Sequence, residues 1–339
     1  MTRRLALIVM AAVSTLIVLP PGARGQLAVG EISGTVGATG ITFHGYVALL
    51  DYGAYRFSPF VRNPPPCTAA RPGFAPLVTT PDWGRRAGVF LAVNGSFSLP
   101  EQEYKPGDCL QMIGPIKSFG NIVAGAVQRP DGGGSPVLLF SPVNIPSIKM
   151  ASGPDIDGAF NVVSGQWQTC ASIGPGCNGI PSNGSLLVSA GRNMGSTTEP
   201  VPNDPTSRTA VGLTKDSVLV VIMIEGGLPG YSDGIDLINL AEVLIAFQVD
   251  NAVNFDGGGS STIVYTPAAA MPRDASIGLY TLMKAAQRKS AAGLSFQFTQ
   301  RDLGIPFASR PTEKLGDGNR LYRPVVSHFG FGLVPTQAH

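Results

Sequence analysis

The chain has 339 residues, of which 14% are charged and 44% are hydrophobic, and its formal net charge at pH 7 is +2. This composition is atypical of disordered chains, and there is no basic stripe that would bind nucleic acid through its phosphates. No linker divides the sequence, so we expect one large folded domain over residues 26–339.

Residues 1–25 have the pattern of a secretory signal peptide. Two arginines precede an apolar run that ends at Leu19, and a small-x-small site at Ala23-Arg24-Gly25 permits cleavage before Gln26. The apolar run is shorter than the roughly 20 residues of a membrane span, although an uncleaved anchor is the alternative. We expect a secreted or periplasmic protein with no membrane span after cleavage.

Most of the remaining chain is typical of strands separated by turns. Apolar or β-branched runs bounded by Gly, Pro, Asn or Asp predict strands at 41–50, 89–94, 122–127, 137–140, 185–189 and 218–224. Residues 57–81 are expected to form a long loop. Apolar residues at helical spacing predict one helix over 236–247, with Asp236 as its N-cap.

Strand 218–224, helix 236–247 and a further strand at 251–255 together predict a β-α-β unit. Such units place ligands at the carboxyl ends of their strands, where Glu225 and Asp256 fall. If the two strands are neighbours, these acids share one cleft. The expected fold class is α+β (mixed α/β): a strand-rich single domain with a mixed sheet and a β-α-β unit carrying the site.

The four cysteines of an exported chain suggest two disulfides. Cys170 and Cys177 lie close together in a Gly/Pro-rich loop and are expected to pair, which leaves Cys67 with Cys109. A metal site is the alternative, but neither pair has CxxC spacing and no histidine lies nearby.

The most informative stretch is Asp256-Gly257-Gly258-Gly259-Ser260-Ser261-Thr262, which follows the last of these strands. Glycines allow positive φ and close approach of a ligand to the backbone. Successive amides in such a turn can form a concave nest for an anion, to which the hydroxyls add donors. Asp256, at the mouth of this nest, is expected to do chemistry, orient the turn or meet a cation.

The same five letters occur earlier as Asp131-Gly132-Gly133-Gly134-Ser135. This copy lies between two prolines and joins the apolar runs 122–127 and 137–140, so it predicts a surface hairpin loop with a structural role only.

Two further residues have open interpretations. Arg208 is either a surface ion-pair member or a guanidinium that grips a phosphate with two hydrogen bonds. Asn94, followed by glycine, is either a turn residue or a group that binds a sugar hydroxyl.

Four motifs follow one another along the chain: Val93-Asn94-Gly95-Ser96-Phe97, Arg208-Thr209-Ala210-Val211-Gly212, Glu225-Gly226 and Asn254-Phe255-Asp256-Gly257-Gly258-Gly259-Ser260-Ser261-Thr262. In this order they resemble the phosphodiester glycosidase family, which includes bacterial exopolysaccharide-associated proteins. Arg323-Pro324-Val325 is similar to the family's closing motif. The resemblance covers about residues 40–334. The chain departs from the family pattern at Glu225, where aspartate is usual, at Phe255, where leucine is usual, and at Phe97-Ser98, which replaces a paired aromatic.

The resemblance implies a hydrolase that cleaves a sugar from a glycosyl-1-phosphodiester. Asp256 is then the first catalytic candidate and Glu225 the second, while Asn94, Arg208, Thr209 and the loop from Gly257 to Thr262 bind the substrate. A phosphate leaving group, whose second pKa is about 6, needs charge stabilisation more than proton donation. No cofactor is expected, although an oxygen-ligated Ca²⁺ is an alternative.

Two other functions are weighed against this one. A serine hydrolase built on Ser260 or Ser261 needs a base, and the chain has only His44, His328 and His339. A non-catalytic carbohydrate-binding or exopolysaccharide assembly protein of the cell envelope is the main alternative.

Overall fold

The computed structural model describes residues 26–37, 39–53, 57–65, 67, 73–98, 105–125, 134–165, 186–195, 204–268, 279, 293–314 and 319–333. The expected signal peptide, the Cys170–Cys177 pair and Asp131–Gly133 of the first glycine copy lie outside these residues. Within the described part of the chain, none of the helices is long and apolar enough to cross a membrane.

The main sheet has eight strands in the order β13-β12-β16-β14-β15-β2-β1-β18. Their bounds are β1 (Gln26–Val36), β2 (Ile41–Asp51), β12 (Val188–Ser189), β13 (Arg192–Asn193), β14 (Arg208–Thr214), β15 (Val218–Glu225), β16 (Val249–Asn254) and β18 (Leu294–Gln300). Helix α5 (Leu237–Ala246) packs on one face through its apolar side chains, including Leu240 and Leu244. The Asp236 carboxylate accepts from Asn239 N at 2.8 Å, which confirms the predicted N-cap.

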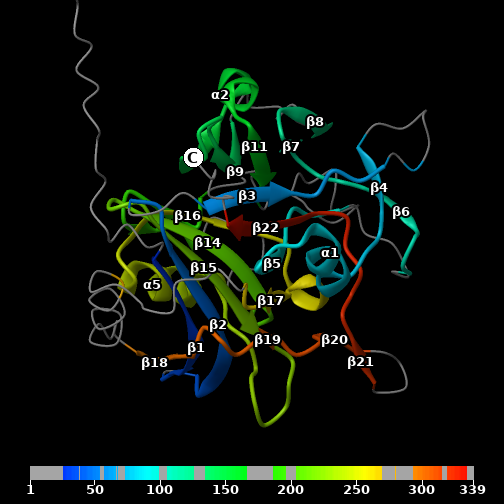
Figure 1. The fold of residues 1–339 in the computed structure, drawn as a ribbon. Helices are drawn as coiled ribbons and strands as arrows, with labels where there is room; N and C mark the ends of the chain where they lie inside the picture. Colours follow the sequence, from blue (N-terminus) through cyan, green and yellow to red (C-terminus); the bar gives the residue numbers. More distant parts are fainter. Residues whose placement is uncertain are drawn as a thin grey trace, which may run out of the picture.

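A five-stranded sheet covers part of the other face of the main sheet, in the order β19-β17-β5-β22-β3 (Figure 1). Its strands are β3 (Phe57–Val61), β5 (Leu91–Asn94), β17 (Ile263–Tyr265), β19 (Phe307–Ala308) and β22 (His328–Leu333). Helix α1 (Thr80–Ala87) packs against this sheet and is capped at its N-terminus by Thr79, whose hydroxyl accepts from Asp82 N. The largest apolar core lies between the two sheets and includes the fully buried Phe255 and Phe329.

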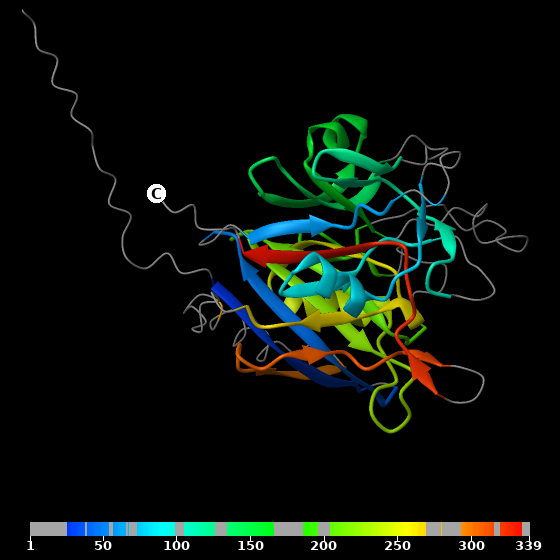
Figure 2. The ribbon, with the colours of Figure 1, turned by 45° about the vertical axis from the view of Figure 1, so that its right-hand side comes forward.

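A second five-stranded sheet, in the order β10-β9-β11-β7-β8, stands at the top of the views in Figures 1 and 2. It contains β7 (Ile116–Ser118), β8 (Asn121–Ala124), β9 (Ser135–Phe140), β10 (Pro146–Ala151) and β11 (Asn161–Ser164), with α2 (Gly153–Gly158) after β10. Two ribbons complete the described fold: β4 (Phe74–Pro76) with β6 (Cys109–Gln111), and β20 (Glu313–Lys314) with β21 (Arg320–Leu321).

Three expectations about topology are corrected. First, β15 and β16 are not neighbours, because β14 lies between them and runs antiparallel to both. Every pairing among the described strands is antiparallel, so neither a mixed sheet nor a β-α-β unit of adjacent strands is present there. Second, the expected loop 57–81 contains β3, β4 and the start of α1. Third, β8 pairs with β7 rather than with β9, so the first glycine copy does not join a hairpin.

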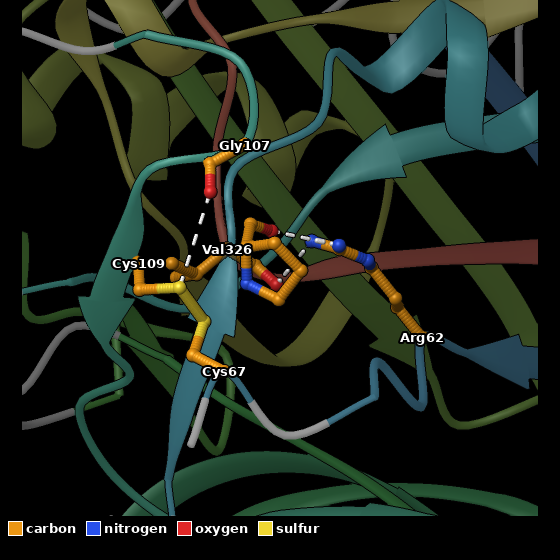
Figure 3. The surroundings of a disulfide bond; sticks show 6 residues. Arg62, Cys67, Gly107, Cys109 and Val326 are labelled. Atoms are coloured by element: carbon orange, nitrogen blue, oxygen red, sulfur yellow. Dashed lines mark hydrogen bonds between the residues drawn. A yellow bond between two sulfur atoms is a disulfide. The ribbon is translucent and has the colours of Figure 1, made fainter.

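The predicted disulfide between Cys67 and Cys109 is confirmed (Figure 3). It joins the segment after β3 to the start of β6. The nearby Arg62 guanidinium donates to the carbonyl oxygens of Val325 and Val326 at 3.2 and 2.9 Å. These contacts fix the segment that leads from the end of the chain's last ribbon into β22.

Candidate active site

Asn94, the last residue of β5, connects three distant segments of the chain. Its Nδ2 donates to the Asp256 carbonyl oxygen at 2.7 Å, and its Oδ1 accepts from the Thr209 hydroxyl at 2.8 Å and from the Thr262 amide at 2.9 Å. The side chain is fully buried. Both polar atoms of its amide group are thus bound to protein groups, and Asn94 anchors the glycine-rich loop.

The glycine-rich loop, residues 256–262, turns through the short 3-10 helix η1 (Gly258–Ser260). Gly258 has a φ of 59°, in the left-handed region that favours glycine, as the sequence predicted. Of the six amides from Gly257 to Thr262, five donate to Asp256 Oδ1, Ser207 O, Gly257 O, Gly258 O and Asn94 Oδ1. The expected nest of free amides is therefore occupied by the protein's own oxygen atoms.

The loop is covered by an ion pair between Glu313 and Arg323. A Cβ on Gly259 would clash with Glu313 Oε2 and lie 2.8 Å from Arg323 Cζ. The absence of a side chain at Gly259 is what lets this pair lie directly on the loop. Arg323, noted in the sequence as part of a closing motif, thus belongs to the site.

Arg208 begins β14, between the carboxyl ends of β15 and β16. Its Nη2 donates to Asp204 O at 3.0 Å, and a Cβ on Gly257 would lie 3.8 Å from its Nη1. The side chain is 4% exposed. The guanidinium charge therefore lies beside the loop, largely removed from solvent.

Glu225 and Arg208 extend from opposite faces of the main sheet. Arg208 pairs with Ile224 and shares its face, which is the face covered by α5. Glu225, one residue further along β15, lies on the other face and pairs with His44 of β2. The two acids expected at adjacent strands, Glu225 at the end of β15 and Asp256 after β16, are thus separated by β14.

The Glu225 carboxyl is fully buried in a cluster of aromatic and cationic groups. Its Oε1 accepts from the Arg310 amide, and the Tyr231 hydroxyl and the Arg310 guanidinium interact with it electrostatically. Burial raises the pKa of Glu225, and the interactions with Arg310 and Tyr231 oppose that rise. Tyr231 stacks on His44 with ring centroids 4.4 Å apart, and Arg310 Cζ lies 3.6 Å from the Tyr231 ring centroid.

A strap, residues 309–313, links the two halves of the site. Ser309 N donates to Ile263 O at 2.9 Å, and the Arg310 amide donates to Glu225. The Thr312 hydroxyl lies 3.1 and 3.2 Å from the carbonyl oxygens of Gly258 and Gly259. Because Arg310 and Thr312 are two residues apart, at most about 7 Å of extended chain separates them. The strap therefore holds Glu225 close to the glycine-rich loop.

Sequence reasoning missed Tyr231, Arg310 and the strap. These residues lie in irregular segments with no motif of their own, and Arg310 is 85 positions from Glu225 along the chain. The available signal was a cluster of arginines after residue 300, namely Arg301, Arg310, Arg320 and Arg323.

Both described histidines stack on other aromatic rings. His44 stacks on Tyr231, and the fully buried His328 stacks on Trp83 at 5.2 Å. Among the described residues, the buried Ser261 hydroxyl has no hydrogen-bond partner, so the nucleophile–base hydrogen bond of a serine hydrolase is not formed at this residue. Within the same residues, no group of three or more His, Cys, Asp or Glu side chains is placed to hold a metal ion.

Comparisons with known proteins give one family match and several similar solved structures. A family model described as phosphodiester glycosidase matches residues 88–294. A comparison with curated proteins gives no significant match. Among solved structures, the catalytic domain of zebrafish N-acetylglucosamine-1-phosphodiester alpha-N-acetylglucosaminidase, auto-inhibited by its pro-peptide, is similar with a TM-score of 0.58 and 17% identity, over 91% of this chain and 84% of that one. A putative exported protein from Burkholderia pseudomallei K96243 aligns with a TM-score of 0.44 and 14% identity, over 86% of this chain and 74% of that one.

Proposed function

Because the chain belongs to the phosphodiester glycosidase family, we propose that it is an exported hydrolase that cleaves a sugar from a glycosyl-1-phosphodiester. The observation that carries the proposal is the Asn94 hydrogen-bond set, which joins the motif segments around Asp256, Thr209 and Thr262 into one unit. Three motifs that are far apart in sequence thereby meet at one edge of the main sheet.

In the proposed reaction, water attacks the anomeric carbon and the bond from that carbon to the phosphate oxygen breaks. The half-buried Asp256 accepts the proton of the attacking water or stabilises the oxocarbenium-like centre. The phosphate leaves as a monoester whose second pKa is about 6, so it needs little protonation at neutral pH. Arg208 stabilises its negative charge, and no cofactor is required for these steps.

Glu225 is the second candidate for the catalytic carboxylate. Its raised pKa favours the protonated form, and Arg310 and Tyr231 lie against it, which is a combination typical of functional carboxyls. Export follows from the signal-peptide pattern of residues 1–25, and the Cys67–Cys109 disulfide suits an oxidising compartment.

The test is release of reducing sugar from a panel of sugar-1-phosphodiesters by the purified protein. We expect Asp256→Asn to lower kcat by several orders of magnitude with KM nearly unchanged, because the lost interaction belongs to the transition state. Asp250→Asn is the matched control, since Asp250 lies on the same strand and its ion pair with Lys215 is remote from the loop. Near-normal kcat in Asp256→Asn would move the catalytic assignment to Glu225.

Arg208 is tested by comparing charged and neutral substrates. Arg208→Lys replaces a two-pronged donor by a point charge, so we expect a higher KM and a lower kcat on the phosphodiester. The same variant should change little on a neutral aryl glycoside. Equal losses on both substrates would assign Arg208 a structural role.

A non-catalytic sugar-binding or exopolysaccharide assembly protein is the second candidate function. The internal use of five amides in the glycine-rich loop favours it, because those donors are not free to hold a phosphate. Binding of a phosphodiester without release of reducing sugar, under conditions where the protein is folded, would support this candidate over the hydrolase.

A further inference from the structure

The face of the main sheet that carries Glu225 changes from apolar to polar along its length. At one end, Leu27 and Val29 of β1 and Leu50 of β2 are buried in the core beneath the sheet β19-β17-β5-β22-β3. Further along the same face, glutamate, serine and threonine replace these residues in β1, as Glu31, Ser33 and Thr35. Sheet residues two apart share a face, so this change marks where the covering sheet ends.

The polar part of this face is continuous across three strands. Ser33 pairs with His44 of β2 and with Gln297 of β18, and Thr35 pairs with Thr42 and Ser295 in the same way. Paired residues project from the same side of a sheet. These side chains line a hollow of about 450 Å³, which we name the polar groove. Its volume lies within the range of roughly 300–1,000 Å³ that small-molecule sites occupy.

The polar groove leads directly to Glu225. Glu225 pairs with His44, which pairs with Ser33, which pairs with Gln297, so the four residues form one row across β15, β2, β1 and β18. With strands about 4.8 Å apart, this row is roughly 14 Å long. The three strands β1, β2 and β18 form the lower edge of the main sheet in Figure 1.

One wall of the groove is held firmly in place. Tyr231 stacks on His44, while the segment around it is fixed to β2: the Ser232 hydroxyl accepts from His44 N at 2.9 Å, and Asp233 Oδ2 accepts from Thr42 N at 2.8 Å. The stack on Tyr231 therefore fixes the His44 ring at the end of the groove nearest Glu225.

The chemistry of the lining indicates what the groove binds. On the face that carries Glu225, its described lining side chains are serine, threonine, glutamine and histidine, with no lysine or arginine among them. The Phe296 ring lies on the other face, stacked on Phe247. Hydroxyl and amide groups exchange hydrogen bonds with sugar hydroxyls. The described lining residues therefore carry no lysine or arginine for a phosphate, whereas Arg310 and Arg208 lie at the site itself.

We propose that the polar groove is a subsite for a neutral glycan segment attached to the reacting sugar phosphodiester. The proposal rests on the proposed hydrolase function for the identity of the attached group. The substrate is then a glycan-linked phosphodiester, with its charged centre at the glycine-rich loop and its neutral sugars along the row from His44 to Gln297.

The test uses Ser33→Tyr, which fills the groove from the middle of a strand with a residue that strands accommodate well. Ser147→Tyr is the matched control, because Ser147 is also a half-buried strand serine but belongs to β10 of another sheet. The first measurement is calorimetric binding of a panel of neutral trisaccharides of glucose, mannose and galactose. We expect wild-type protein and Ser147→Tyr to bind at least one of them, and Ser33→Tyr to bind it at least tenfold more weakly.

The second measurement compares kcat/KM on two phosphodiesters that share one sugar-1-phosphate, one with a methyl group and one with a neutral trisaccharide attached. Wild-type protein should prefer the longer substrate at least tenfold, and Ser33→Tyr should lose the preference while keeping its activity on the shorter one. Hydrolysis without trisaccharide binding or length preference would overturn the groove and leave the hydrolase intact. Trisaccharide binding that Ser33→Tyr abolishes, without hydrolysis of either substrate, would support the groove and overturn the hydrolase.

Discussion

Replacing Asn94 by alanine should damage stability and chemistry together. The change removes the donor to the Asp256 carbonyl oxygen and the acceptor of the Thr209 hydroxyl and the Thr262 amide. At about 1 kcal/mol for each lost hydrogen bond, the free energy of unfolding should fall by about 3 kcal/mol. Without its anchor the loop can move, and a displacement of about 1 Å at a reacting group costs roughly 100-fold in rate.

Asn161 provides the control for this prediction. It is equally buried, but its two hydrogen bonds join β11 to Phe119 N and Pro59 O, away from the loop. Asn161→Ala should therefore cost about 2 kcal/mol of stability and leave kcat/KM unchanged. Stability is measured by urea unfolding, and kcat/KM is measured on a sugar-1-phosphodiester at a temperature where both variants are folded.

Two results would refute the reasoning. One is an Asn94→Ala variant that retains kcat/KM within threefold of wild type while losing about 3 kcal/mol of stability, as expected of an ordinary buried hydrogen-bonding residue. Alternatively, Asn161→Ala could lose as much activity as Asn94→Ala, which would make the loss a general effect of destabilisation.

Three further predictions concern the loop, the disulfide and pH. Gly259→Ala should reduce kcat/KM more than Gly258→Ala. The first puts a methyl group into the Glu313–Arg323 pair, whereas the second costs only about 1–2 kcal/mol of backbone strain without a clash. Steady-state kinetics of both folded variants test this order. Selective reduction of the Cys67–Cys109 disulfide, which closes a loop of 42 residues, should lower the free energy of unfolding by about 4 kcal/mol, and an unchanged urea midpoint would contradict it. Burial holds the pKa of His328 well below its ordinary value of 6.5, so the unfolded chain binds the proton more tightly than the folded one. The free energy of unfolding should therefore fall as the pH drops below 6.5, by up to about 1.4 kcal/mol per pH unit. His328→Phe should remove this part of the pH dependence in unfolding curves measured at pH 5 and pH 7.

The strands and the helix that carry the site were predictable because their patterns are local. Helix α5 shows apolar residues at helical spacing behind an Asp236 cap, and β15 is an unbroken apolar run. The pairing partners were harder to predict, since strand order depends on contacts between distant segments. The short turn between β14 and β15 indicates that these two strands pair, but the position of β16 beyond β14 follows only from the observed pairing.

The site was only partly predictable for a related reason. The sequence left Asn94 with two interpretations, a turn residue or a sugar ligand, and the structure places its amide inside the protein as a link between segments. The environment of Glu225 depends on Arg310 and Tyr231, which have no local pattern and meet the carboxyl only when the chain folds. Their contributions could not be read from spacing.

The strand order also determines which fragments of the chain can be produced in soluble form. The family match spans residues 88–294, yet β15 inside it pairs along its whole length with β2, from Val218 opposite Asp51 to Glu225 opposite His44. A fragment trimmed to the match would leave β15 as an open apolar edge, which is a template for aggregation. It would also lack Arg310 and Thr312, which hold Glu225 and the glycine-rich loop. The matched range is therefore a region of shared sequence rather than a unit that folds alone.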